Sequence, residues 1–128
     1  MTKMLSKNLS EDEFKCKCCG ICVVDPVYIR KFQLLRNLVA EPLVHTNGYR
    51  CPKHNAEVGG APGSFHMKGM AGDIACDGAD KARRYKIVKY AIEVGFGGIE
   101  ISPWHIHLDV RPPSQGVVLI MDENKKIL

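Results

Sequence analysis

The chain has 128 residues, 45% of them hydrophobic and 25% charged, which is the composition of a globular domain rather than of a disordered chain. No apolar run approaches the roughly 20 residues that a membrane-spanning helix needs, so we expect no membrane span. The net charge of +4 comes from scattered Lys and Arg residues, and without a basic tract it argues against a nucleic-acid partner.

A short helix or turn is predicted near the N-terminus, where residues 10–13 read Ser-x-x-Glu, the pattern of a capping box. A longer helix then starts with Asp25 as N-cap and Pro26 as first helical residue, and Pro42 ends it. Its apolar residues recur at helical spacing and predict one buried stripe, formed by Tyr28, Phe32, Leu35 and Val39.

The middle of the chain contains two predicted strands with an irregular region between them. Residues 43–46 form the first strand, and Asn47-Gly48 is a turn signal. Residues 51–72 are rich in Gly, Pro, Asn and His without a regular period, so we predict a long functional loop. The second strand covers residues 70–76.

The second half predicts one helix and three more strands. Residues 77–80 cap the helix, Gly95 ends it, and its predicted buried stripe is Ala82, Tyr85, Val88 and Ile92. The strands cover residues 97–101, 105–110 and 117–121, with Ser102-Pro103 joining the first two. This order of elements predicts an α+β domain, with helices packed against a small, mostly antiparallel sheet.

The strand at 105–110 carries a group of ionisable side chains. Because successive side chains on a strand point to opposite faces, His105, His107 and Asp109 share one face. Ile106 and Leu108 then face the core. Polar groups of this kind are rarely buried for packing alone, so we expect the three to form the wall of a site.

His66 and Asp73 are the second part of this site. His66 lies at the end of the irregular region, Asp73 lies in the following strand, and Gly69 allows a tight turn between them. Imidazole nitrogen and carboxylate oxygen suit Zn(II), and three protein ligands with one open position are typical of a catalytic zinc ion. The third ligand is expected from His105 or His107.

The six cysteines are a separate feature. Four of them cluster at Cys16, Cys18, Cys19 and Cys22, whereas Cys51 and Cys76 stand apart. Residues 1–13 are polar and lack the apolar stretch of a secretory signal, so we expect no signal peptide in this chain. Clustered cysteines then favour metal binding over disulfides. We expect a cysteine-rich knuckle near 16–22, with a second, structural zinc ion, reduced thiols and disulfides as alternatives.

Three motifs resemble those of the zinc D-Ala-D-Ala carboxypeptidase family, which includes peptidoglycan peptidases and phage endolysin peptidases. The hedgehog signalling domain shares the fold of this family. The motifs are Gly48-Tyr49-Arg50-Cys51-Pro52-x-His54-Asn55 with Val58-Gly59-Gly60, Ser64-x-His66-x-x-Gly69-x-Ala71-x-Asp73-Ile74, and His105-x-His107-x-Asp109.

The resemblance implies a role for each of five residues. His66, Asp73 and His107 would bind the single catalytic zinc ion. Arg50 would face the substrate, where a guanidinium can stabilise developing negative charge. Ser64 would hydrogen-bond the substrate.

The general base departs from the family pattern. Relatives often carry an acidic residue three positions before the last zinc ligand, but this chain has Trp104 there. Glu100 is the nearest upstream acid, and the turn at 102–103 can bring it back toward the zinc. His105 is the second candidate. Asp109 is the third, although we favour it as the residue that orients a ligand imidazole.

The resemblance therefore implies a single zinc peptidase domain over residues 1–128, expected to be a monomer. Its substrate would be the stem peptides of peptidoglycan, cleaved as a carboxypeptidase or an endopeptidase, and the protein would be phage-encoded or exported to reach the bacterial cell wall. The missing acid supports an alternative, a non-enzymatic zinc-binding recognition module of the same fold.

Overall fold

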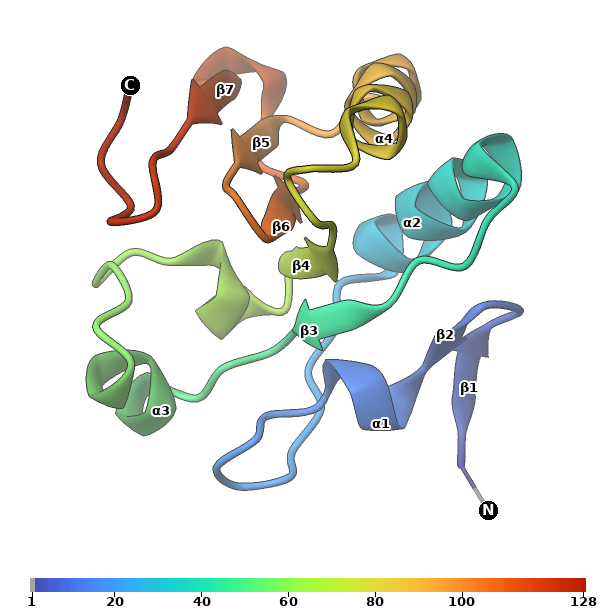
Figure 1. The fold of residues 1–128 in the computed structure, drawn as a ribbon. Helices are drawn as coiled ribbons and strands as arrows, with labels where there is room; N and C mark the ends of the chain where they lie inside the picture. Colours follow the sequence, from blue (N-terminus) through green and yellow to red (C-terminus); the bar gives the residue numbers. More distant parts are fainter. Residues whose placement is uncertain (1) are drawn as a thin grey trace.

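A five-stranded sheet forms the centre of the computed structural model, which describes residues 2–128 (Figure 1). In spatial order the strands are β3 (His45–Asn47), β4 (Ala71–Ala75), β6 (His105–Asp109), β5 (Gly98–Ile101) and β7 (Val117–Ile120). All neighbouring strands are antiparallel except β5 and β7, which run parallel. The predicted α+β class with a mostly antiparallel sheet is therefore confirmed.

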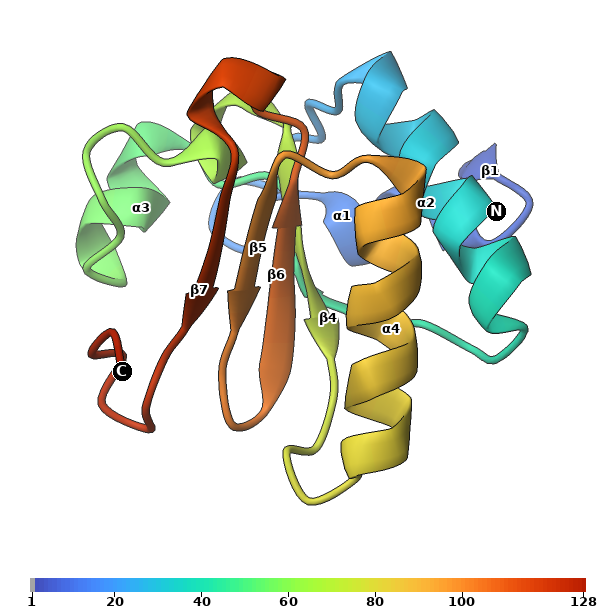
Figure 2. The ribbon, with the colours of Figure 1, turned by 90° about the horizontal axis from the view of Figure 1, so that it is seen from above.

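Helices α2 (Pro26–Val39) and α4 (Lys81–Val94) lie together on one face of the sheet, and Figure 2 shows α3 (Pro52–Glu57) on the opposite side. The core fills the space between the two long helices and the sheet. Side chains alternate between the two faces along each strand, and those on the helix side contribute to the core. Ile74, Ile106 and Leu108 are all fully buried there. The other sheet face is left for polar side chains.

The predicted start and buried stripe of α2 are confirmed. The Asp25 side chain accepts a hydrogen bond from the backbone N–H of Val27, and Pro26 is the first helical residue. All four predicted stripe residues have no exposed surface. The helix ends at Ala40, whose φ of 58° is left-handed, just before Pro42.

Helix α4 has the predicted caps, Asp80 and Gly95, but its predicted stripe is wrong except at Val88, which is partly buried against the core. Tyr85 is 71% exposed and Ile92 57% exposed, whereas Ile87 and Ala91 have no exposed surface. The helix contains a second apolar row through Ile87 and Ala91 at the same helical spacing, so periodicity alone does not choose between the two. Packing on the sheet selects the row with the short Ala91 side chain, which allows a close approach.

The region 51–72, predicted as an irregular loop, contains two short helices. In α3, Cys51 is the N-cap and Pro52 the first residue. In η1 (Phe65–Lys68), the Ser64 side chain accepts a hydrogen bond from the N–H of His66. Neither helix is long enough for two turns, so no hydrophobic period could reveal it.

The N-terminal residues add a small hairpin, β1 (Met4–Ser6) and β2 (Leu9–Ser10), followed by α1 (Glu11–Phe14). Ser10 caps α1 as predicted, because its Oγ accepts from the N–H of Glu13, and its hydroxyl also lies 3.4 Å from Glu13 Oε2. Phe14 at the end of α1 is fully buried. Among residues 2–128, the structure contains no helix that is both long and apolar enough to cross a membrane.

Candidate active site

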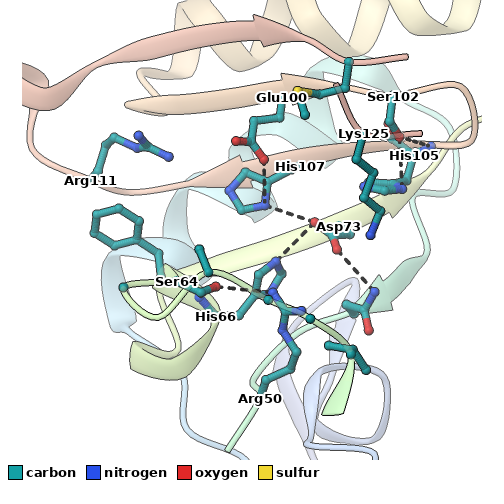
Figure 3. Close-up of a pocket in the computed structure, with 18 residues that line it drawn as sticks. Arg50, Ser64, His66, Asp73, Glu100, Ser102, His105, His107, Arg111 and Lys125 are labelled. Atoms are coloured by element: carbon teal, nitrogen blue, oxygen red, sulfur yellow. Dashed lines mark hydrogen bonds and ion pairs between the residues drawn. The ribbon is translucent and has the colours of Figure 1, made fainter. Parts of the chain in front are cut away.

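The structure brings His66, Asp73 and His107 together on the polar face of the sheet (Figure 3). Asp73 in β4 lies directly opposite His107 in β6, so their side chains share one sheet face. His66 comes from η1, which ends at Gly69 with a φ of 67° and turns the chain into β4. Asp73 Oδ1 lies 3.3 Å from His66 Nε2 and 3.1 Å from His107 Nδ1.

The second nitrogen of each imidazole is held by a protein acceptor. His66 Nδ1 donates to the Gly48 carbonyl at 2.7 Å, and His107 Nε2 donates to Asp109 Oδ2 at 2.8 Å. Asp109 is itself fixed by a bidentate pair with Arg111, at 2.8 and 2.6 Å. Such outer contacts fix the ring orientation of metal-binding histidines. They leave His66 Nε2 and His107 Nδ1 facing Asp73.

Charge is concentrated in this group of side chains. Burial opposes ionisation of Asp73, but hydrogen bonds from His107 and His66 hold its pKa well below the ordinary value. Burial likewise disfavours protonation of His107, yet its contacts with Asp109 and Asp73 raise its pKa to about 9. The contacts that favour a proton on His107 would also favour a bound cation beside Asp73.

The donor set fits a zinc ion. Two ring nitrogens and one carboxylate oxygen lie within 4.8 Å of one another, which is the donor number and type of a catalytic zinc site. Tetrahedral ligands at Zn–N and Zn–O lengths of about 2.0–2.1 Å are separated by roughly 3.3 Å. The observed separations of 3.3 and 3.1 Å match this value. Zinc ligation by these residues stays a prediction, for which the geometry is suitable.

A cleft of about 670 Å³ opens over the three donors and contains the other predicted site residues. Arg50 and Ser64 lie on one side, joined by a hydrogen bond of 3.3 Å from Arg50 Nη2 to Ser64 Oγ. Glu100 and His105 lie on the sheet side of the cleft (Figure 3). Trp104, at the usual position of the family acid, is 53% exposed and does not line this cleft.

Glu100 reaches the donors because β5 and β6 form a hairpin. It lies opposite His107 in the strand register, and its Oε2 is 4.0 Å from His107 Nδ1. His105 is less close and is held by Ser102, whose hydroxyl lies 3.1 Å from His105 Nδ1. Burial lowers the pKa of His105, so its imidazole is mainly neutral near pH 7.

Three polar residues of the cleft were missed in the sequence. Asn47 donates to Asp73 Oδ2 at 3.2 Å, and its place beside the Gly48 motif was a usable signal. Arg111 continues the alternation that predicts His107 and Asp109, so it could also have been found. Lys125 had no local signal, because it reaches the cleft only through the path of the chain after β7.

The cysteine cluster forms a second candidate metal-binding group, well separated in sequence from the cleft donors. The sulfur atoms of Cys16, Cys19 and Cys51 lie within 4.8 Å of one another. All six cysteines are free thiols in the structure. The group therefore joins two cysteines of the expected knuckle near 16–22 to Cys51, whereas Cys18, Cys22 and Cys76 are not part of it.

Comparison with known proteins gives one match at the level of a family. No curated protein matches the chain significantly. The model of the family described as Peptidase M15 matches residues 7–109, a range that includes His66, Asp73 and His107. Metallopeptidase chemistry and zinc binding are consistent with this family and with the donors in the cleft. The chain belongs to the peptidase M15 family, and its resemblance to the zinc D-Ala-D-Ala carboxypeptidases is thereby confirmed.

Proposed function

We propose that the protein is a zinc-dependent peptidase that hydrolyses the stem peptides of peptidoglycan. The observation that carries the proposal is the convergence of His66 Nε2, Asp73 Oδ1 and His107 Nδ1 at the base of an open cleft. The same cleft contains an acid, Glu100, and a guanidinium, Arg50. In this proposal these groups act as the metal ligands, the proton acceptor and the anion stabiliser that metal-assisted amide hydrolysis requires.

Zinc in this site would lower the pKa of water toward about 7 and polarise the scissile carbonyl. Glu100 accepts the proton as the water oxygen bonds to the carbonyl carbon. It then returns that proton to the leaving nitrogen as the C–N bond breaks, so the products are a carboxylate and an amine. His105 is the second candidate for the transfer, because its neutral imidazole can accept a proton.

We assign to Arg50 the stabilisation of the negative charge that develops on the carbonyl oxygen. Its side chain is half-buried between the cleft and Ser64, and burial lowers its pKa, although the nearby charge of Asp73 opposes that shift. Within residues 2–128, its Nε atom is buried and has no hydrogen-bond partner. The Arg50 side chain lines the cleft, so its guanidinium is placed to meet a substrate oxygen there.

The charges of the cleft also fit this substrate class. Arg50, Arg111 and Lys125 line it alongside Asp73 and Glu100. Stem peptides carry free carboxylates, which Arg50 and Lys125 can pair with, whereas Arg111 is already paired with Asp109. The D-configuration of the substrate follows from the family resemblance. Carboxypeptidase and endopeptidase action are both compatible with this cleft.

The test is hydrolysis of purified peptidoglycan by the zinc-loaded protein. We expect new amino groups to appear, with free D-alanine if the enzyme is a carboxypeptidase and without it if it is an endopeptidase. Glu100→Gln should lower kcat by about 10²-fold or more at unchanged zinc content. His105→Ala tests the second candidate, and Glu93→Gln on the exposed side of α4 is the matched control. If neither Glu100→Gln nor His105→Ala changed the rate, the assignment of the proton transfer would be wrong.

A second candidate function is a zinc-binding recognition module without catalysis. It is favoured by Trp104, which stands where relatives often carry the acid. A protein that retained zinc and bound peptidoglycan, but released no product from any wall preparation, would support this alternative.

A further inference from the structure

Four thiols gather outside the cleft, where the loop after α1 meets the start of α3. Cys16, Cys19 and Cys51 have their sulfur atoms within 4.8 Å of one another. The thiol of Cys18 lies within hydrogen-bonding reach of Cys51. The proposed peptidase chemistry uses none of these residues.

The backbone around Cys16 forms a tight turn that directs N–H groups toward sulfur. Gly20 closes the turn with a φ of 73°, and its N–H donates to the Cys16 carbonyl at 2.9 Å. The N–H of Cys51 donates to Cys16 Sγ at 3.4 Å, and the N–H groups of Cys18 and Cys19 also point to that sulfur. A thiol is a weak acceptor, whereas a thiolate is a strong one. The turn is therefore suited to a negatively charged sulfur.

Cys51 has a similar environment on the other side of the cluster. Its Sγ accepts a hydrogen bond from the N–H of His54 at 3.4 Å, as the N-cap of α3. The start of α3 thus provides backbone donors to both sulfur atoms, from Cys51 to Cys16 and from His54 to Cys51.

The ionisation of the thiols agrees with this geometry. Burial opposes ionisation of Cys16, but the N–H groups of Cys51, Cys19 and Cys18 lower its pKa to about 6. Burial and contact with Cys51 raise the pKa of Cys18. For Cys19, a backbone contact with Ile21 has the opposite effect, yet burial and contact with Cys16 raise its pKa overall. Sulfur atoms this close repel one another once ionised, and a divalent cation would remove that repulsion.

We propose that Cys16, Cys18, Cys19 and Cys51 bind a structural zinc ion, separate from the ion in the cleft. Four thiolates and no open position are the donor set of a closed, tetrahedral structural site. Cys19 lies three positions after Cys16 in the knuckle, and Cys51 closes the site from a segment 32 positions beyond Cys19. The ion would fasten the loop after α1 to the first turn of α3.

The position of Cys51 links this site to the cleft wall. It directly follows Arg50, whose N–H donates to the His66 carbonyl at 3.1 Å. On the other side of Arg50, the N–H of Tyr49 donates to the Phe14 carbonyl at 2.7 Å. The zinc would add a third attachment to the segment that holds Arg50.

Zinc content per chain tests the proposal. Protein purified under reducing conditions should contain about two zinc ions, and Cys16→Ser with Cys19→Ser should retain about one. Cys22→Ser, in the same loop but outside the cluster, is the matched control and should retain both. His107→Ala should lose only the ion in the cleft, so each variant removes one ion and retains the other. Wild-type protein with a single zinc ion that His107→Ala removes would overturn the proposal.

A spectroscopic measurement on the unmodified protein covers the case in which the serine variants do not fold. Replacement of zinc by cobalt(II) should give the intense sulfur-to-metal charge-transfer absorption of a thiolate site, and a thiol-blocking reagent should abolish it. Cobalt-loaded protein without this absorption, or a disulfide between Cys16 and Cys51 in freshly purified protein, would contradict the site.

Discussion

Asp109 has no exposed surface, yet it connects two ionisable side chains. It accepts from His107 Nε2 and pairs with the guanidinium of Arg111. These contacts lower its pKa although burial opposes ionisation. At the scale of single residues, the candidate centre therefore depends on groups behind the donors as much as on the donors themselves.

Asp109→Asn should weaken zinc binding in the cleft about 10- to 100-fold, because the amide can present its N–H₂ group to His107 and disturb the ring. Competition with a chelator measures the affinity, and Asp12→Asn on the exposed side of α1 is the control. Unchanged affinity would mean that Asp109 does not orient the ligand.

Arg50→Ala should lower kcat/KM for peptide hydrolysis about 10²-fold or more while the zinc content stays the same, because it removes a donor to the developing oxyanion. Arg30→Ala on the exposed side of α2 is the control, because it also removes one positive charge. Equal kcat/KM for the wild type and Arg50→Ala would remove Arg50 from the proposed mechanism.

Individual elements differ in how far their sequence determines them. Helix α2 and strand β6 could be predicted because a single hydrophobic period fits each of them. In α4 two apolar rows fit the same period, and only packing on the sheet selects Ile87 over Ile92. The three donors were predictable from short motifs and strand alternation, whereas Lys125 was not, because its position follows from long-range packing of the chain after β7.

The corrected face of α4 has a measurable consequence. Ile87→Ala should lower the free energy of unfolding by about 2–4 kcal/mol, since it empties a buried position. Ile92→Ala on the exposed row should change it by no more than about 0.5 kcal/mol. Urea unfolding of the two variants tests which face of α4 packs on the sheet. A larger loss of stability for Ile92→Ala than for Ile87→Ala would support the stripe predicted from the sequence.

The end of η1 depends on Gly69. Its φ of 67° is unfavourable for other residues, and an added Cβ would collide with the backbone of Val23 and Val24. Gly69→Ala should therefore destabilise the protein by more than about 1 kcal/mol and displace His66. Gly63→Ala faces open space and serves as control. Similar unfolding midpoints for both variants would contradict this account of the turn.

At the scale of the whole molecule, the two faces of the sheet have different roles. One face packs on α2 and α4 and contains the core, and the other carries the donors and the cleft. Residues from η1, β4, β5, β6 and the segment after β7 meet only because the sheet aligns them. The face with the donors is the proposed metal-dependent catalytic surface.

The most direct test of that account is the anomalous scattering of crystals of the zinc-loaded protein at the zinc absorption edge. We expect a strong peak within bonding distance of His66 Nε2, Asp73 Oδ1 and His107 Nδ1. Zinc-loaded, active crystals with no peak at these atoms, or with His105 in place of His107, would contradict it.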